Sequence, residues 1–374
     1  MFSLVSKEEA RHMPEKRKPI VMDHALSTPF GTGTDAVWSA LLDKRRAENA
    51  PAPPAERPEE SRVQRLLDPI AAKIASWNCD LLVLASTKGE IDVFERLSRK
   101  ARRESGGPPP LALFDDIRPE RFLERVSSRL GIPSAVFVSS ACASSNIAIA
   151  VAAEKLLSGQ ATRVAVIGID IVSEFVVSGF SALGALSPSN TASPFDADRD
   201  GLVVGEACAA ILLEKGLPGT GLGTVMGWGS ASDANHVTGP SRNGDGLAAA
   251  LGEALATAET APSEIAAVCA HGTGTVYNDA MEIKAFERIF PSTIPTFSAK
   301  GALGHTMGAA GALETLLALE TARRKRIPPT VGLKTPDKDA APWVSPESAE
   351  IADGPVVNAN SGFGGVNSVL ILSL

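Results

Sequence analysis

Short apolar runs, separated by longer segments of mixed polarity, recur along the whole chain and predict buried strands joined by helices. In the first half the compact apolar runs lie at residues 81–85, 135–138 and 163–169. Helix patterns fall at 35–46, 119–130 and 147–157, and another helix is expected after the first of these strands. Strand, helix and strand of these lengths form a parallel unit, so the sequence predicts an α/β fold.

The second half of the chain shows the same rhythm from about Gly221 onward. Its apolar runs lie at 265–270, 355–358 and 369–372, and its helix patterns at 244–259, 279–290 and 309–323. We therefore expect two similar βα halves, 18–220 and 221–374, behind a polar and poorly ordered leader at 1–17. A segment rich in proline, alanine and glutamate at 50–59 indicates an exposed loop.

Composition narrows the class of protein. Of the 374 residues, 44% are hydrophobic and 21% are charged, as in ordinary globular proteins. No apolar run reaches the roughly 18 residues of a membrane span, and the charged N-terminus is unlike a signal peptide. We therefore expect a cytoplasmic protein that does not enter a membrane. The net charge of −7 argues against general nucleic-acid binding.

Two basic clusters, at 96–103 and 323–326, interrupt this acidic balance. Each is compatible with a solvated helix face or helix end, which is the common case. The less common alternative is a docking patch for an acidic partner. The sequence leaves both interpretations open.

Four cysteines occur, and none belongs to a Cys-x-x-Cys pair, so their spacing predicts neither a zinc site nor a disulfide framework. Cys79, Cys208 and Cys269 lie in or beside apolar runs and are expected in the core. Cys142 has a different setting, in a turn of small residues between the apolar run at 135–138 and the following helix. Either it is another small core residue, or its thiol lies at the positive end of a helix, where thiolate is favoured.

Two of the five histidines have glycine neighbours that would let a ligand approach closely. His271 lies in the sequence AHGTGT and His305 in LGHTMG, both at predicted junctions between loops and regular elements. A single loop histidine is usually structural or solvated. Two of them, together with a cysteine at a strand-to-helix turn, favour nucleophilic catalysis.

A set of motifs that run in order along the chain makes the prediction of nucleophilic catalysis more specific. The motifs are 141–145 (ACASS), 193–201 (SPFDADRDG), 270–275 (AHGTGT), 300–305 (KGALGH), 309–311 (AAG), 327–330 (IPPT) and 362–367 (GFGGVN). In this set the chain resembles the β-ketoacyl-acyl-carrier-protein synthases of the elongating type. The similarity extends from about residue 18 to the end and is strongest after Gly131.

The resemblance implies a thiolase-like fold, in which two similar βα halves form a layered αβαβα architecture, usually as a homodimer. It implies that Cys142 accepts an acyl group from acyl carrier protein as a thioester. His271 and His305 would bind the malonyl thioester and stabilise the enolate formed as CO2 leaves. The backbone N–H groups of Cys142 and Phe363 would form the oxyanion hole.

Further residues match supporting positions of the family. Lys300 matches a lysine that acts electrostatically on the histidines, and Glu314 matches the acidic residue beyond it. Thr273 and Thr275 match a pair of hydroxyls that hold the phosphopantetheine arm. Asp279 and Glu282 match an acidic pair behind His271, and Phe363 matches a gating ring. Thiolate and imidazole chemistry suffices for this reaction, so we expect no metal and no cofactor beyond the carrier's own arm.

The chain departs from the family pattern in places that shape the pocket. Ser361 replaces a second phenylalanine before the glycine-rich turn, and Leu202 stands where an aromatic residue is common. Ala207 and Cys208 replace a Gly-Ala pair. These changes leave the three reactive groups in place and bear on acyl specificity.

Several functions remain to be weighed. The first is an active condensing enzyme of fatty acid, polyketide or polyene biosynthesis. The second is a non-catalytic partner subunit that sets chain length in a heterodimer, although such partners lack the nucleophile. The third is a condensing enzyme of the thiolase superfamily that works on coenzyme A, and the fourth is a carrier-binding module. Cys142 with both histidines favours the first.

Overall fold

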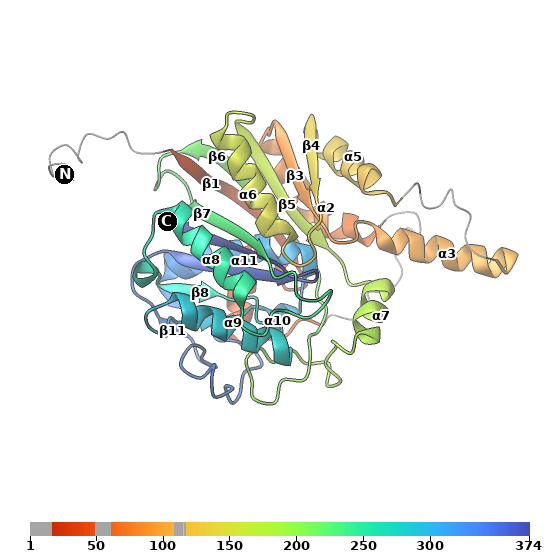
Figure 1. The fold of residues 1–374 in the computed structure, drawn as a ribbon. Coiled ribbons are helices and arrows are strands. Elements are labelled where there is room, and N and C mark those ends of the chain that lie inside the picture. The colour runs from red at the N-terminus through yellow and green to blue at the C-terminus, as the bar shows by residue number, and fades with distance from the viewer. Residues whose placement is uncertain (1–16, 49–60, 108–114, 116) are drawn as a thin grey trace.

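The computed structural model describes residues 17–48, 61–107, 115 and 117–374. Among these residues, 11 strands form one sheet in the order β4-β3-β5-β6-β1-β7-β13-β12-β8-β9, with β2 beside β1 (Figure 1). The expected leader at 1–17, apart from its last residue, and the whole of the expected loop at 50–59 lie outside the described residues. None of the described helices is both long enough and apolar enough to cross a bilayer.

The first half contributes six strands and six described helices. The strands are β1 (Lys18–Thr28), β2 (Gly31–Thr32), β3 (Leu81–Ala85), β4 (Ser134–Val138), β5 (Arg163–Asp170) and β6 (Ala207–Gly216). The helices are α1 (Thr34–Leu42), α2 (Arg62–Ser76), α3 (Ile91–Ser105), α5 (Pro119–Leu130), α6 (Ser144–Leu157) and α7 (Glu174–Ala182).

The second half begins with β7 (Gly223–Ser232). Its other strands are β8 (Ala267–Cys269), β9 (Thr296–Phe297), β10 (Arg326–Ile327), β11 (Ala349–Glu350), β12 (Val356–Gly362) and β13 (Val366–Ser373). Its helices are α8 (Asp245–Ala258), α9 (Val276–Ile289), α10 (Lys300–Leu303) and α11 (Ala310–Arg324), with short 3₁₀ turns η2 (Pro262–Glu264) and η3 (Met307–Ala309). The predicted division between the halves at 220 and 221 falls between β6 and β7.

The two halves have the same topology. If the main strands of each half are numbered along the chain, both halves show the order 3-2-4-5-1. In both, strands 3, 2 and 4 run parallel, and strands 5 and 1 run antiparallel to their neighbours. The halves meet where β1 pairs with β7 over only two residue pairs, Ile20 with Thr224 and Val21 with Gly223.

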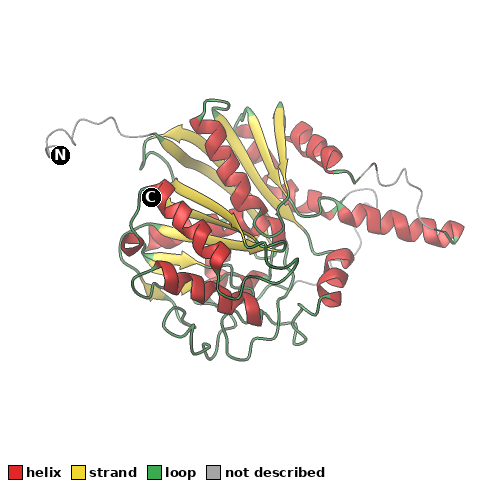
Figure 2. Cartoon of the chain, in the orientation of Figure 1, coloured by secondary structure: helices red, strands yellow, loops and turns green. Residues whose placement is uncertain are grey.

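Helices lie in three layers around the two halves of the sheet (Figure 2). The central layer holds α6 and α11, whose side chains share one apolar cluster with strands of both halves. An outer cluster joins α2 and α5 to the first half, and another joins α8 and α9 to the second. This is the layered thiolase-like arrangement that the resemblance implied. Because α6 is covered on all sides, its buried residues do not follow a single stripe.

Two sequence predictions about the first half need correction. The run at 135–138 forms β4 as expected, but β4 is the edge of the sheet, so most of its side chains are only partly buried. The sequence pattern also missed α2, whose Ser61 side chain accepts a hydrogen bond from Val63 N. Val63, Leu67, Ile70 and Ile74 bury one face of α2 at helical spacing. The charged residues between them and the internal Pro69 obscured that pattern.

Candidate active site

Cys142 lies in a tight turn between the edge strand β4 and the central helix α6. Ala141 has a φ of 47°, a conformation rare for residues with a side chain, and α6 begins at Ser144. The Ser144 hydroxyl accepts a hydrogen bond from Ser140 N at 2.8 Å and donates one to Ala141 O at 2.6 Å. Strained, locally braced turns of this kind present a side chain at the start of a helix.

The end of β12 packs directly against this turn. A Cβ at Gly362 would lie 3.1 Å from the backbone nitrogen of Cys142, so only glycine allows this approach without displacing the turn. The close packing brings the backbone N–H of the next residue, Phe363, to the Cys142 sulfur. This N–H is one of the two donors that the expected oxyanion hole requires.

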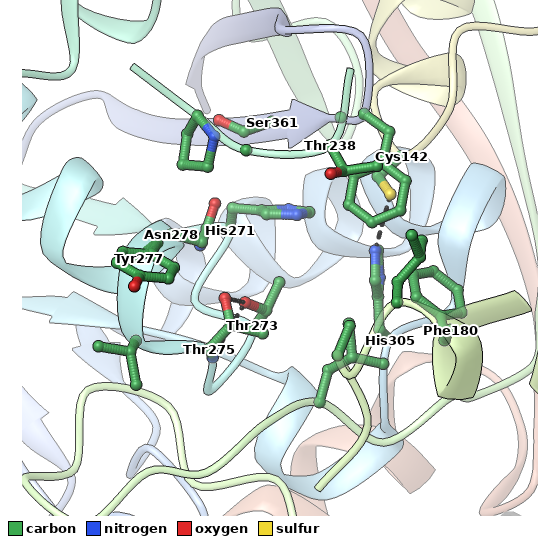
Figure 3. A pocket seen from close by; sticks show the side chains of 18 of the residues that line it. Cys142, Phe180, Thr238, His271, Thr273, Thr275, Tyr277, Asn278, His305 and Ser361 are labelled. Carbon is green, nitrogen blue, oxygen red and sulfur yellow. Dashed lines mark hydrogen bonds between the residues drawn. The ribbon is translucent and has the colours of Figure 1, made fainter. Parts of the chain in front are cut away.

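His271 and His305 face the same sulfur from two other loops (Figure 3). His305 Nε2 lies 2.8 Å from Cys142 Sγ, and the two imidazole rings are nearly perpendicular with centroids 5.1 Å apart. All three side chains are buried. Residues that are widely spaced in the sequence thus form one compact cluster.

Backbone hydrogen bonds hold both histidines in place. His271 follows β8, and its N–H donates to Glu282 Oε1 at 2.7 Å, on α9. His305 lies between α10 and η3, and its N–H donates to Val203 O at 2.6 Å. Each histidine backbone is therefore fixed by a segment distant in sequence.

The hydrogen bonds of the rings assign the two histidines opposite tautomers. Met307 N–H points at Nδ1 of His305 over 3.3 Å, which leaves the ring proton on Nε2, toward the sulfur. Nδ1 of His271 instead lies 3.3 Å from Asn360 Oδ1, so Nδ1 carries the proton. The Asn360 orientation follows from its Nδ2, which donates to Glu314 Oε2 at 2.9 Å. His305 therefore presents a donor to the site and neutral His271 presents an acceptor. In this arrangement only His305 can donate to an enolate oxygen, which differs from the expectation that both histidines stabilise the enolate.

Lys300 and Glu314 form a buried ion pair beside the histidines, and each side chain is only 2% exposed. Burial lowers the pKa of His271 and His305 well below the ordinary value, and the positive charge of Lys300 lowers both further. Both imidazoles are therefore neutral at neutral pH.

The prediction that the helix end favours the Cys142 thiolate is wrong for the free protein. Burial raises the pKa of the Cys142 thiol to about 12, and this outweighs the opposing effects of Lys300 and of the Phe363 N–H. Loss of hydration costs a buried thiolate more than the partial charges at a helix end return. The group at rest is therefore a thiol.

The acidic pair behind His271 shapes its loop. Glu282 accepts hydrogen bonds from the backbone N–H groups of His271 and Gly272, and Asp279 accepts from those of Thr273 and Gly274. Burial raises the pKa of Glu282 to about 8, with a further rise from the neighbouring Asp279. Both residues lie on α9, so this helix sets the course of the loop that carries His271.

Two cavities meet at Cys142. The larger cavity has a volume of about 450 Å³, and its lining includes Cys142, His271, Thr273, Thr275, His305 and Phe363. The Thr273 and Thr275 hydroxyls lie 3.0 Å apart on its wall (Figure 3). The smaller cavity, of about 220 Å³, is mostly apolar and is lined by Ala141, Cys142, Val176, Gly179, Phe180, Met307 and Phe363, among others. Phe363 and Cys142 thus border both spaces.

The structure adds residues that sequence reasoning missed. Asn360 fixes the His271 tautomer, and Phe180 of α7 stands beside Phe363 with ring centroids 5.6 Å apart. Asp170, at the end of β5, accepts hydrogen bonds from Thr87 N and from Gly308 N, close to His305. Of these residues only Asn360 could have been noticed in the sequence, because an asparagine is unusual in an apolar strand. Nothing in the sequence links Phe180 or Asp170 to the site.

Comparison with known protein families gives two matches in adjacent segments. The family described as "Beta-ketoacyl synthase, N-terminal domain" matches residues 124–218, and "Beta-ketoacyl synthase, C-terminal domain" matches 222–334. Together they cover more than half of the chain and include Cys142, His271 and His305.

Individual proteins agree with these matches. The chain is 36% identical over 242 residues to 3-oxoacyl-(acyl-carrier-protein) synthase 2 of Mycobacterium leprae, which is 61% of this chain and 58% of that protein. The chain spans 50% to 58% of the length of three such curated relatives.

Two solved structures resemble the whole fold. A β-ketoacyl synthase from Burkholderia phymatum is 28% identical with a TM-score of 0.81, covering 96% of this chain and 99% of that one. The ishigamide ketosynthase/chain length factor is 25% identical with a TM-score of 0.82 and the same coverage.

Proposed function

Because the chain belongs to the β-ketoacyl synthase family, we propose that it catalyses the decarboxylative condensation of an acyl group with a malonyl unit, both delivered on acyl carrier protein. The observation that carries the proposal is the convergence of Cys142, His271 and His305 on one cavity that reaches the sulfur. A soft nucleophile, a hydrogen-bond donor and an oxyanion hole are the groups that this reaction needs.

In the first step the Cys142 sulfur attacks the carbonyl carbon of the acyl thioester. The oxyanion is held by the N–H groups of Cys142 and Phe363, and the carrier thiol leaves with the proton that the Cys142 thiol gives up. Because the free thiol holds its proton tightly, this proton passes to the leaving group as the new thioester forms. The acyl chain then lies in the smaller cavity.

In the second step the malonyl thioester enters the larger cavity along Thr273 and Thr275. Its carboxyl group leaves as CO2, and the electron pair of the broken bond gives an enolate. His305 Nε2–H donates to the enolate oxygen, and the charge of Lys300 stabilises it through space. The tautomer of His271 assigns it a hydrogen-bond-accepting role in the same cavity.

In the third step the enolate carbon attacks the acyl-Cys142 carbonyl and a carbon–carbon bond forms. The bond from the carbonyl carbon to Cys142 sulfur breaks, and the thiolate that leaves takes a proton from water in the larger cavity. None of these steps requires a metal or a redox cofactor. We place the protein in the cytoplasm, where carrier-bound substrates are found. We expect it to work as a homodimer or with a paralogous subunit, and the resemblance to a ketosynthase/chain length factor supports the second arrangement.

Mass spectrometry of the intact protein tests the proposal. Incubation with acyl carrier thioesters should add one acyl group at Cys142, and malonyl carrier protein should then release CO2 and yield the extended β-ketoacyl product. Cys142→Ala should form no product, whereas Cys79→Ser, a change at a thiol remote from the cavities, should behave like the original protein. Condensation by Cys142→Ala would contradict the assignment of the nucleophile.

A further inference from the structure

The three reactive side chains also lie close enough together to bind one metal ion. One donor atom from each of Cys142, His271 and His305 lies within 4.8 Å of the other two. In a tetrahedral site neighbouring ligand atoms are roughly 3.5 Å apart, so small rotations of buried side chains would bring the three into range of one ion. No spacing in the sequence indicates this cluster, because its members come from three separate loops.

The chemistry of the donors selects the kind of ion. A sulfur and two imidazole nitrogens are the ligands of zinc and related soft divalent ions, and they do not suit magnesium or calcium. A fourth position is open, because the larger cavity reaches the sulfur and admits water. Three protein ligands with an open position are the usual arrangement at accessible zinc sites.

The hydrogen bonds around the cluster predict moderate affinity. Asn360 holds the proton of His271 on Nδ1, which leaves Nε2 free to bind a metal. His305 is less favourable, because a metal on its Nε2 moves the proton to Nδ1 and forfeits the 3.3 Å bond from Met307 N–H. The nearby Lys300 charge is balanced by Glu314. These features fit a reversible ion better than a permanent one.

We propose that Zn²⁺ binds reversibly to Cys142, His271 and His305 in the free protein and prevents acylation of the cysteine. On binding, the thiol proton passes to water in the larger cavity, a zinc–sulfur bond forms, and no group is oxidised or reduced. An acyl-cysteine has no thiolate to offer, so acylated protein excludes the ion. The binding stands on the geometry alone, whereas its effect on acylation rests on the proposed function.

Titration with Co²⁺ as a spectroscopic probe tests the binding. The protein should take up one equivalent with a thiolate-to-cobalt absorption band and the visible bands of a tetrahedral ion, and Zn²⁺ should displace it. Cys142→Ser should lose the charge-transfer band, and His271→Ala should weaken Zn²⁺ binding at least tenfold in equilibrium dialysis. Cys79→Ser is the matched control and should keep both the charge-transfer band and the affinity for Zn²⁺. An unchanged band in Cys142→Ser, or no band at all in the original protein, would overturn the proposal.

A second arm separates this inference from the proposed function. Micromolar Zn²⁺ should slow transfer of the acyl group to Cys142, a chelator should restore it, and protein acylated beforehand should show no cobalt band. Should the metal-free protein fail to accept any acyl group while the cobalt site forms, the proposed function fails and the metal site stands. Should acyl transfer proceed at full rate with the ion bound, the inference fails instead.

Discussion

His305 Nε2 lies 2.8 Å from the sulfur of Cys142, although 163 residues separate the two in the chain. The contact joins the start of the central helix α6 to the loop that leads into the other central helix, α11. Because Met307 N–H occupies Nδ1, the proton of the ring points into the site. A donor held so close to the sulfur is also close to any thioester oxygen that enters beside it.

Replacing this donor should separate the two half-reactions. We expect His305→Ala to slow decarboxylation of malonyl carrier protein by about 10²–10³-fold, the usual effect of losing one donor to a developing oxyanion. Acyl transfer to Cys142, which relies on backbone donors, should fall much less. His305→Gln keeps an N–H and should recover part of the loss. Timed CO2 release and intact mass measure the two steps, and equal retention of both would remove His305 from the site.

Lys300 should control the acid limb of the pH profile. Burial lowers the pKa of both histidines, and the Lys300 charge lowers it further, so Lys300→Met should raise that pKa. A raised pKa leaves the imidazoles protonated up to a higher pH, which moves the acid limb of kcat/KM upward. Lys300→Met also leaves Glu314 buried without its partner, a loss typically worth about 3–5 kcal/mol. The double variant Lys300→Met/Glu314→Gln should regain stability and keep the shifted pH profile. An acid limb at the same pH as in the original protein would contradict this role of Lys300.

Glu282 should make the folded protein less stable as the pH rises toward 8. Its carboxyl ordinarily loses its proton near 4.5, but burial and then Asp279 raise the folded pKa to about 8. Between these values the folded state binds more protons than the unfolded state, so the free energy of unfolding falls with rising pH. The slope is at most about 1.4 kcal/mol per pH unit.

Urea unfolding of wild-type protein and Glu282→Gln, measured across this pH window, checks the prediction. The amide does not titrate, so the stability advantage of the wild-type protein should shrink as the pH increases. A constant difference between the two proteins at every pH would show that Glu282 is ionised in the folded state throughout.

The two basic clusters should differ in their effect on carrier protein. The first lies on α3, which extends away from the layered body, and Arg99, Lys100, Arg102 and Arg103 are exposed there (Figure 1). In the second cluster Arg323, Arg324 and Lys325 are already paired with acidic side chains, namely Glu320, Asp35 and Asp353. Arg99 on α3 is likewise paired, with Glu174, but Lys100, Arg102 and Arg103 have no ion-pair partner among the described residues. Exposed charges of this kind are better placed to attract an acidic protein.

Reversing the four charges on α3 should raise the KM for carrier-bound substrate several-fold at low salt, with less effect at high salt. The KM for the same acyl group on coenzyme A should stay unchanged. Reversal of Arg323 and Lys325 serves as the control and should leave the carrier KM as it is. Equal behaviour of both variants would reduce the α3 cluster to a solvated helix face.

Gly179 offers a direct test of the smaller cavity as the acyl site. It lies inside α7, and a Cβ placed there would meet no heavy atom within 4 Å. Gly179→Leu should therefore fold, since leucine also favours the helix by up to about 1 kcal/mol over glycine. Its side chain should fill the cavity and shorten the longest acyl chain found on Cys142. Gly179→Ala is the matched control, and an unaltered chain-length range in Gly179→Leu would place the acyl group elsewhere.

Local pattern predicted most of the regular elements, because burial imposes a recognisable spacing on each. The runs at 81–85 and 163–169 became β3 and β5, and the helix at 119–130 became α5. The predicted ends of elements were less accurate where a strand contains polar residues. β12 continues to Gly362 through Asn358 and Asn360, whose side-chain amides donate hydrogen bonds to buried partners. Polar residues in a strand carry no apolar signal, so sequence reasoning ended that strand early.

By itself the sequence determined the α/β class, the chemical types at the site and the motifs that revealed the family, since these depend on residue identity and order. Only the tertiary structure decided that three loops converge on one cavity and which nitrogen of each histidine carries its proton. It also decided that burial keeps Cys142 a thiol despite the helix end. Such properties depend on distance, hydrogen-bond partners and access to water, and the order of residues in a chain encodes none of these directly.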